Sequence, residues 1–159
     1  MSWRNLENPE NMYEAKRLLT LDANVFVAAL KRDEPHSDEC VNILNKVPTK
    51  FLLCEPSIVY QEVCGTIARK IDLEAAKHAE QSLSKLIHPL LLITCDKSFC
   101  LSSYKLCHEY KIYSIDALYL KTALDFSAVL VSLDKEDFID KIKSKKPRIE
   151  VYHVEEFPY

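Results

Sequence analysis

Two carboxylates stand at the ends of apolar runs, where strands of a sheet would finish. Asp22 closes the first run in RLLTLDANVFVAAL, and Asp134 follows the apolar run of AVLVSLDKEDF. Two further acids fall in helix-like segments. A helical turn of about 100° per residue puts Glu62 in the apolar arc of CEPSIVYQEVCGTIARK and Asp116 on an apolar stripe of SIDALYLKTALDF. A carboxylate that faces a core is costly unless it is paired or bound to a metal, so the four acids together predict an acidic pocket.

Such a pocket is suited to metal-dependent chemistry at phosphate. Clustered carboxylates repel one another and resist ionisation, so a cation is expected among them. Ligand sets made only of oxygen suit Mg²⁺ or Mn²⁺. One or two such ions can activate water and stabilise an in-line displacement at phosphate. Each acid taken singly also has a structural alternative: Asp22 and Asp134 as helix caps, Asp116 as a favourable first-turn charge, and Glu62 as an edge residue that reaches solvent.

The segments that must position these acids alternate between strand-like and helix-like patterns. Strands are predicted at 17–21, 51–54, 90–94, 128–132 and 150–154. Helices are predicted at 24–31, 37–46, 56–70, 73–87, 98–110, 116–126 and 135–144. Most of the strand candidates are continuously apolar, which is typical of strands covered on both faces. The pattern therefore predicts a three-layer α/β/α sandwich around a mostly parallel sheet, in which ligands collect at the carboxyl ends of the strands.

Composition excludes several classes of protein. Gly65 is the only glycine, so the dinucleotide, P-loop and nucleophile-elbow motifs are all impossible. The net charge of −3 provides no overall basic field for nucleic acid. We expect a polar leader at 1–16, one domain at 17–159, no membrane span and a cytoplasmic location. The six cysteines form no C-x-x-C pair and are expected to be buried free thiols.

The order and surroundings of the four acids resemble the PIN-domain family. The segments that carry this resemblance are LDANVFVAAL, EPSIVYQEV, SIDALYLKTA and LVSLDKEDF. They look most like the small VapC-like toxin ribonucleases of toxin–antitoxin systems, over nearly everything from about residue 18 to 155.

The resemblance implies a parallel sheet of four or five strands and RNA hydrolysis that depends on Mg²⁺ or Mn²⁺. Asp22, Glu62 and Asp116 match the three main acidic positions, and Asp134 matches a fourth, more variable one. All four would be catalytic residues and would hold the metal directly or through water. Asn24 and Ser132 match polar positions that support the site. A homodimer, an RNA substrate and an antitoxin partner are also implied.

Some assignments stay open. DKEDF is one residue longer than the commoner DKDF of the family, so Asp134 and Asp137 compete for the fourth acidic role. Arg69, seven residues after Glu62, is a candidate substrate contact, whereas His36 and Tyr60 are expected to be structural.

Two alternative functions share features with the nuclease. One is a PIN-like scaffold that binds RNA or a partner without cutting. The other is a Mg²⁺-binding receiver domain, which would want paired acids after the first strand; LDANV does not supply them.

Overall fold

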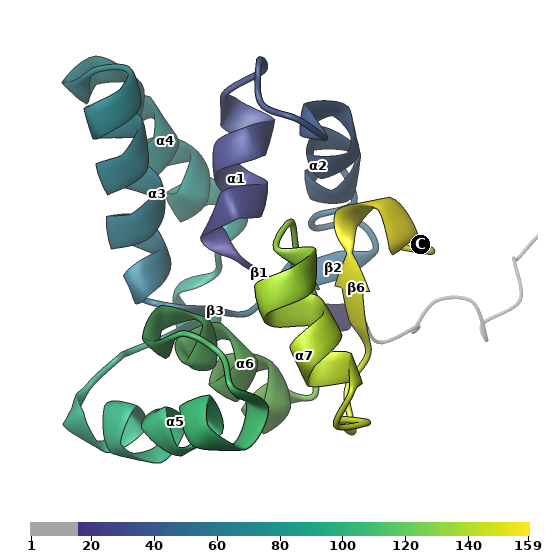
Figure 1. Ribbon diagram of the computed structural model, residues 1–159. Coiled ribbons are helices and arrows are strands. Elements are labelled where there is room, and N and C mark those ends of the chain that lie inside the picture. The colour runs from purple at the N-terminus through teal and green to yellow at the C-terminus, as the bar shows by residue number, and fades with distance from the viewer. Residues whose placement is uncertain (1–15) are drawn as a thin grey trace, which may run out of the picture.

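The centre of the fold is a four-stranded parallel sheet in the order β2-β1-β5-β6 (Figure 1). The computed structural model describes residues 16–159. The strands of the sheet are β1 (Arg17–Leu21), β2 (Phe51–Leu53), β5 (Val129–Ser132) and β6 (Val151–His153). Every residue of β5 and the last three of β1 are buried, because helices cover both faces of these two central strands.

The helices form the two outer layers. They are α1 (Ala23–Leu30), α2 (Ser37–Leu44), α3 (Ile58–Lys70), α4 (Leu73–Leu86), α5 (Lys97–Tyr110), α6 (Ser114–Phe126) and α7 (Asp140–Lys143). On one side α1 packs against α2, α3 and β5, and α4 packs against α3. On the other side α6 packs against β1 and β5, with α5 outside it (Figure 1). The predicted three-layer α/β/α sandwich is therefore confirmed.

The predicted strand at 90–94 does not join the main sheet. Pro89–Leu91 forms a 3₁₀ turn, and the short strand β4 (Leu92–Ile93) pairs in parallel with β3 (Glu55–Pro56) as a separate two-stranded sheet. β3 was not predicted, because a strand of two residues shows no periodicity in the sequence. Pro56 therefore lies in β3 rather than in a first helical turn, and α3 begins two residues later than predicted.

The cysteines, the membrane spans and the polar leader were also subjects of prediction. All six cysteines are free, as predicted, but only Cys40 and Cys54 are buried and Cys100 is exposed. Within residues 16–159 no helix is long and apolar enough to cross a membrane. The polar leader predicted at 1–16 lies outside the described residues apart from Lys16.

The strand order places a ligand crevice between β1 and β5. The chain leaves β1 toward β2 on one side and leaves β5 toward β6 on the other, so the topology switches direction between these two neighbours. In open parallel sheets the crevice outside the carboxyl ends of such strands is where ligands bind. Asp22 follows β1 directly, and Ser132 is the last residue of β5.

Candidate active site

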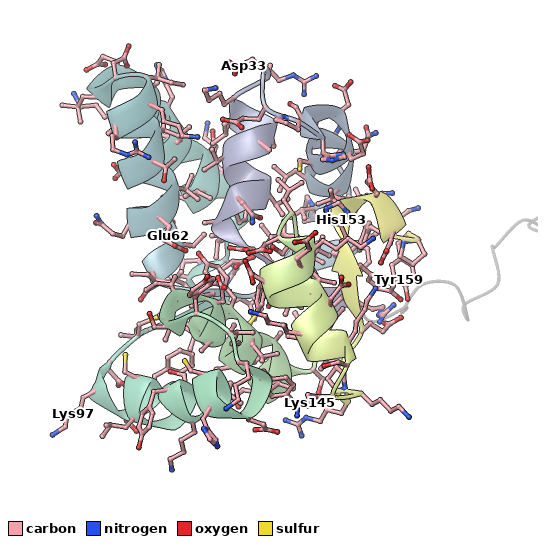
Figure 2. All side chains as sticks on the ribbon, viewed as in Figure 1. Asp33, Glu62, Lys97, Lys145, His153 and Tyr159 are labelled. Atoms are coloured by element: carbon pink, nitrogen blue, oxygen red, sulfur yellow. The ribbon has the colours of Figure 1, made fainter. Side chains whose placement is uncertain are left out.

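A pocket of about 520 Å³ lies at this switch point. All four predicted acids, Asp22, Glu62, Asp116 and Asp134, line it. They come from the end of β1, from α3, from the first turn of α6 and from the turn after β5. Figure 2 shows Glu62 at the end of α3 nearest the middle of the molecule, where carboxylate oxygens gather. Four acids that are far apart in the sequence therefore line the same pocket.

Asp22 does not cap the helix that follows it. It occupies the N-cap position of α1, yet its side chain makes no capping hydrogen bond. Its Oδ2 instead accepts hydrogen bonds from Ser132 Oγ at 2.6 Å and from Asn24 Nδ2 at 3.0 Å. The structural alternative for Asp22 therefore fails, because its carboxylate is turned toward the neighbouring strand end.

Asn24 and Ser132 link the ends of β1 and β5. Asn24 Oδ1 accepts the backbone N–H of Leu133 at 3.1 Å, and Asn24 Nδ2 donates to Ser132 Oγ at 3.1 Å. Ser132 Oγ also accepts the backbone N–H of Asp134 at 3.0 Å. This network fixes the position of Asp22 relative to the turn that carries Asp134.

Glu62 is held from a different helix. It is half-buried on α3 beside the buried Val59 and Val63, and its Oε2 accepts a hydrogen bond from Tyr119 Oη at 2.6 Å. Tyr119 lies one turn after Asp116 on α6 and is fully buried. Glu62 thus lies at the edge of the apolar arc, and its free oxygen is available to the pocket.

The two acids that competed for the fourth position are separated clearly. Asp134 is half-buried and lines the pocket, and its Oδ1 also accepts the backbone N–H of Asp137 at 3.0 Å. Asp137 is exposed, and its Oδ1 pairs with Lys141 Nζ at 2.9 Å. The geometry therefore favours Asp134 as the fourth acid.

A π-helical turn at Lys135–Ile139 takes up the additional residue of DKEDF. The backbone N–H of Ile139 bonds to the carbonyl of Asp134 at 3.0 Å, five residues back, instead of the usual four. Because the wider turn absorbs one residue, Asp134 keeps its place at the end of β5 while Phe138 and Ile139 still reach the core.

Burial and mutual repulsion disfavour ionisation of these acids. Burial raises the pKa of Asp22 to about 6. The hydrogen bond from Ser132 lowers this pKa, and the negative charge of Glu62 raises it further. Burial, followed by the charges of Asp22 and Asp134, raises the pKa of Asp116 to about 7. Burial also raises the pKa of Glu62, opposed by the bond from Tyr119. Within residues 16–159 no Lys, Arg or His forms an ion pair with any of the four.

The donors match Mg²⁺ or Mn²⁺ in type, since they are oxygens with excess negative charge. The side chains are too far apart to bind an ion in their present conformations: in the described part of the chain, no group of three His, Cys, Asp or Glu side chains is arranged to hold a metal ion. Side-chain rotations would have to draw the carboxylates onto an ion. Asp116 and Asp134 are half-buried, which leaves them more room to move than the fully packed Asp22.

Sequence reasoning missed several residues around the pocket. Thr66 and Lys70 line it, at four and eight residues after Glu62 on α3, whereas Arg69 is exposed and does not. A Glu-x-x-x-Thr-x-x-x-Lys spacing could have indicated this face. The loop between α1 and α2 adds Glu34, Pro35 and His36.

Glu55 was also missed and lies against the end of β1. It is fully buried, its Oε1 accepts the backbone N–H of Leu21 at 2.7 Å, and its Oε2 has no hydrogen-bond partner among the described residues. Burial raises the pKa of Glu55 well above its usual range, and the charge of Asp22 adds to the rise. Glu55 therefore supports the end of β1 through its bond to Leu21.

A known family matches most of the chain. Residues 19–144 match the family model described as PIN domain. No curated protein matches the chain at a significant level.

Solved structures with the same fold share little sequence with the chain. VapBC2 from Rickettsia felis, bound to a promoter DNA fragment, is 18% identical with a TM-score of 0.62, covering 86% of this chain and 98% of its own. VapC20 from Mycobacterium tuberculosis, a toxin that cleaves the sarcin–ricin loop, is 11% identical with a TM-score of 0.62, covering 75% and 91%. A toxin–antitoxin complex from Klebsiella pneumoniae is 20% identical with a TM-score of 0.57, covering 77% and 89%. At such low identity these likenesses establish the fold alone.

Proposed function

The chain belongs to the PIN domain family, and we propose that it is a ribonuclease that depends on Mg²⁺ or Mn²⁺. One observation carries the proposal: four carboxylates from four separate elements line one pocket at the switch point of the sheet, and none is paired with a cation within residues 16–159. Uncompensated acids of this kind are costly for folding. A function that requires the charge is the simplest reason for them.

Asp22, Glu62, Asp116 and Asp134 would hold the metal. A divalent ion bound there would supply an activated water and would stabilise charge at the scissile phosphate. Ser132 and Asn24 orient Asp22, and Tyr119 orients Glu62. The protein therefore pre-positions two of the acids, which limits the reorganisation that binding requires.

Asp116 is suited to receive a proton at a carboxylate oxygen. It is half-buried in the first turn of α6 and lines the pocket, so a carboxylate oxygen that is not engaged with the ion could accept a proton from the attacking water. Ser132 is not a nucleophile in this scheme, since its side chain is fully buried and its oxygen already accepts hydrogen bonds from Asn24 Nδ2 and the backbone N–H of Asp134.

The partners of the protein belong to the same proposal. Related folds include a toxin–antitoxin complex, and we extend the proposal to an antitoxin partner and a cytoplasmic location. A homodimer would use the outer face of α5, where Leu101 and Tyr104 are 53% and 61% exposed. Arg69 is placed as an exposed cation next to the pocket residue Lys70, and its contact with RNA stays a prediction.

The test is cleavage of single-stranded RNA by the purified protein with Mg²⁺ or Mn²⁺ and with a chelator. We expect cleavage that the chelator abolishes, loss of at least about a hundredfold for Glu62→Gln, and little change for Asp137→Asn. The Gln variant keeps the shape of Glu62 but loses its charge, and Asp137 is the matched acid outside the pocket. A folded Glu62→Gln protein with full activity would contradict the proposal. Absence of cleavage with either ion would favour a scaffold that binds without cutting.

A further inference from the structure

We propose that the pocket contains a nucleobase subsite, formed by Pro35 and His36 above an apolar floor of Val27 and Ala28, which seats the base next to the scissile phosphate of a single-stranded RNA. This inference rests on the proposed ribonuclease function and specifies how the substrate lies. It also revises the expectation that His36 is only structural.

The pocket is longer than the acidic cluster. Beyond the four acids it continues along α1 past Val27 and Ala28 to the loop between α1 and α2. Val27 and Ala28 are 8% and 2% exposed, so the floor is closed and apolar. A volume of about 520 Å³ falls within the usual range for sites that bind small organic groups. The cavity therefore has room for a nucleotide beside the acids.

His36 is held rigidly at the wall of this extension. Its ring packs edge to face on that of His153, with centroids 5.6 Å apart. His36 Nδ1 lies 3.3 Å from a carboxylate oxygen of Glu155 and 3.7 Å from one of Glu39. His153 is itself buried and lies with Nε2 3.2 Å from the carbonyl of Leu133. Figure 2 shows His153 between α2 and the turn that precedes α7.

The same contacts connect the wall to the acids. Leu133 and Asp134 are consecutive, and both line the pocket with His36. The imidazole of His36 thus rests, through His153, on the turn that presents Asp134. An aromatic ring fixed beside a reacting centre is the arrangement by which proteins seat unstacked RNA bases.

The charges at this end favour a base over a phosphate. Glu34 lines the extension, and Glu155 and Glu39 lie against His36, so the acidic side chains at this end already have partners. Lys70 Nζ, the cation of this wall, lies 3.2 Å from Glu34 Oε1, and Lys31 Nζ lies 3.2 Å from the same oxygen. Because both lysines are already engaged with Glu34, a second phosphate would have to break these ion pairs, whereas a flat, uncharged base would leave them intact.

The test compares His36→Asn with the wild type. Asn is chosen because the backbone of His36 is left-handed, with φ of 60°, and Asn tolerates this conformation while removing the ring. His36→Phe restores an aromatic ring without the ring nitrogens, and His108→Ala is the control at an exposed histidine of α5.

Each protein is assayed on an oligoribonucleotide that the wild type cuts at one mapped position, and on versions in which the nucleotide on either side of the cut lacks its base. We expect kcat/KM to fall about tenfold for His36→Asn on the intact oligonucleotide, with recovery in His36→Phe and no change in His108→Ala. On the oligonucleotide that lacks the base bound in the subsite, the wild type and His36→Asn should have equal kcat/KM. An equal loss on all versions, or no loss on the intact one, would overturn the subsite.

A binding measurement separates this inference from the proposed function. Fluorescence anisotropy with a mixed-sequence oligoribonucleotide and with a fully abasic ribose-phosphate chain is recorded for the wild type and His36→Asn in the Asp116→Asn background. The subsite predicts that His36→Asn weakens binding of the intact chain only. If the wild type cuts no RNA, the proposed function fails and this binding comparison still decides the subsite, since equal affinities for the intact chain would overturn it.

Discussion

The contact between Tyr119 and Glu62 orients one of the proposed metal ligands. The hydroxyl of Tyr119 donates to Glu62 Oε2 at 2.6 Å from a fully buried ring. A bond to an ionised acceptor is worth about 1.5–3 kcal/mol, more than a neutral one. Glu62 is only half-buried, so without this bond its carboxylate could turn toward solvent. We therefore propose that Tyr119 is a positioning residue that acts through Glu62.

Replacement of Tyr119 by Phe should separate positioning from folding. We expect RNA cleavage to fall about tenfold, because Glu62 loses its orientation, while the free energy of unfolding falls by no more than about 1.5–3 kcal/mol, the value of the lost bond, because the ring still fills its site. Steady-state cleavage and urea unfolding would measure the two effects. Tyr60→Phe is the matched control, since its hydroxyl lies 3.0 Å from Ser84 Oγ between α3 and α4. Unchanged cleavage in Tyr119→Phe would contradict the positioning role.

At this scale the acids could be predicted and their partners could not. Asp22 and Asp134 stand at strand ends, and Glu62 interrupts an apolar arc, so local pattern alone identified them. Tyr119 meets Glu62 across 57 residues of sequence, and nothing near either residue indicates the contact. Glu55 is similar: its carboxyl accepts the N–H of Leu21 only because β2 ends before that point.

The helix α3 carries the only glycine of the chain in its interior. A Cβ on Gly65 would meet only Gln61 Nε2, at 3.5 Å, which is an ordinary contact. Glycine in a helix interior costs about 0.5–1 kcal/mol relative to alanine, since it loses more backbone freedom on folding.

Gly65→Ala should therefore stabilise the protein by about 0.5–1 kcal/mol and raise Tm by roughly 1–4 °C. Thermal and urea unfolding of the two proteins would measure this, with Mg²⁺-dependent cleavage as a check that the pocket is intact. A lower Tm in the variant would mean that α3 has less space at this position than the structure indicates.

Most elements were predictable from sequence because they are long enough to show a period. The central strands β1 and β5 were placed correctly within a residue, and the main helices within a few residues at each end. The exceptions are short or irregular. The two-residue strands β3 and β4 have no period, and the π turn at Lys135–Ile139 differs from a helix by one inserted residue.

For the whole molecule, the raised pKa values predict how stability depends on pH without metal. The pKa of Asp22 is about 6 and that of Asp116 about 7, against an ordinary value of 3.8. At a pH between the ordinary value of 3.8 and the raised value of each acid, the folded state retains a proton that the unfolded state has released. Their contribution to stability is therefore full below pH 3.8 and is lost as the pH rises through 6 to 7.

The loss attributable to the buried Asp22 is on the order of 3 kcal/mol. Thermal melts in chelator should show Tm of the wild type falling from pH 5 to pH 8, with a smaller fall in Asp22→Asn. Identical slopes in the two proteins would contradict the assignment of this destabilisation to the pocket.

A bound cation should reverse this effect. Mg²⁺ or Mn²⁺ interacts with the pocket only in the folded state, so saturating metal at pH 8 should raise Tm by several degrees. Differential scanning fluorimetry with each ion would measure the shift, and Glu62→Gln should show a smaller one. No shift at concentrations that support cleavage would count against a carboxylate metal site.

The most direct measurement of the central claim is Mn²⁺ binding by electron paramagnetic resonance, because it observes the ion without depending on an RNA substrate. Free Mn²⁺ is titrated into the wild type, Asp116→Asn and Asp137→Asn. The acidic pocket predicts saturable binding by the wild type and Asp137→Asn, and at least about a tenfold loss of affinity in Asp116→Asn. Equal binding by wild type and Asp116→Asn, or no saturable binding by the wild type, would contradict the account.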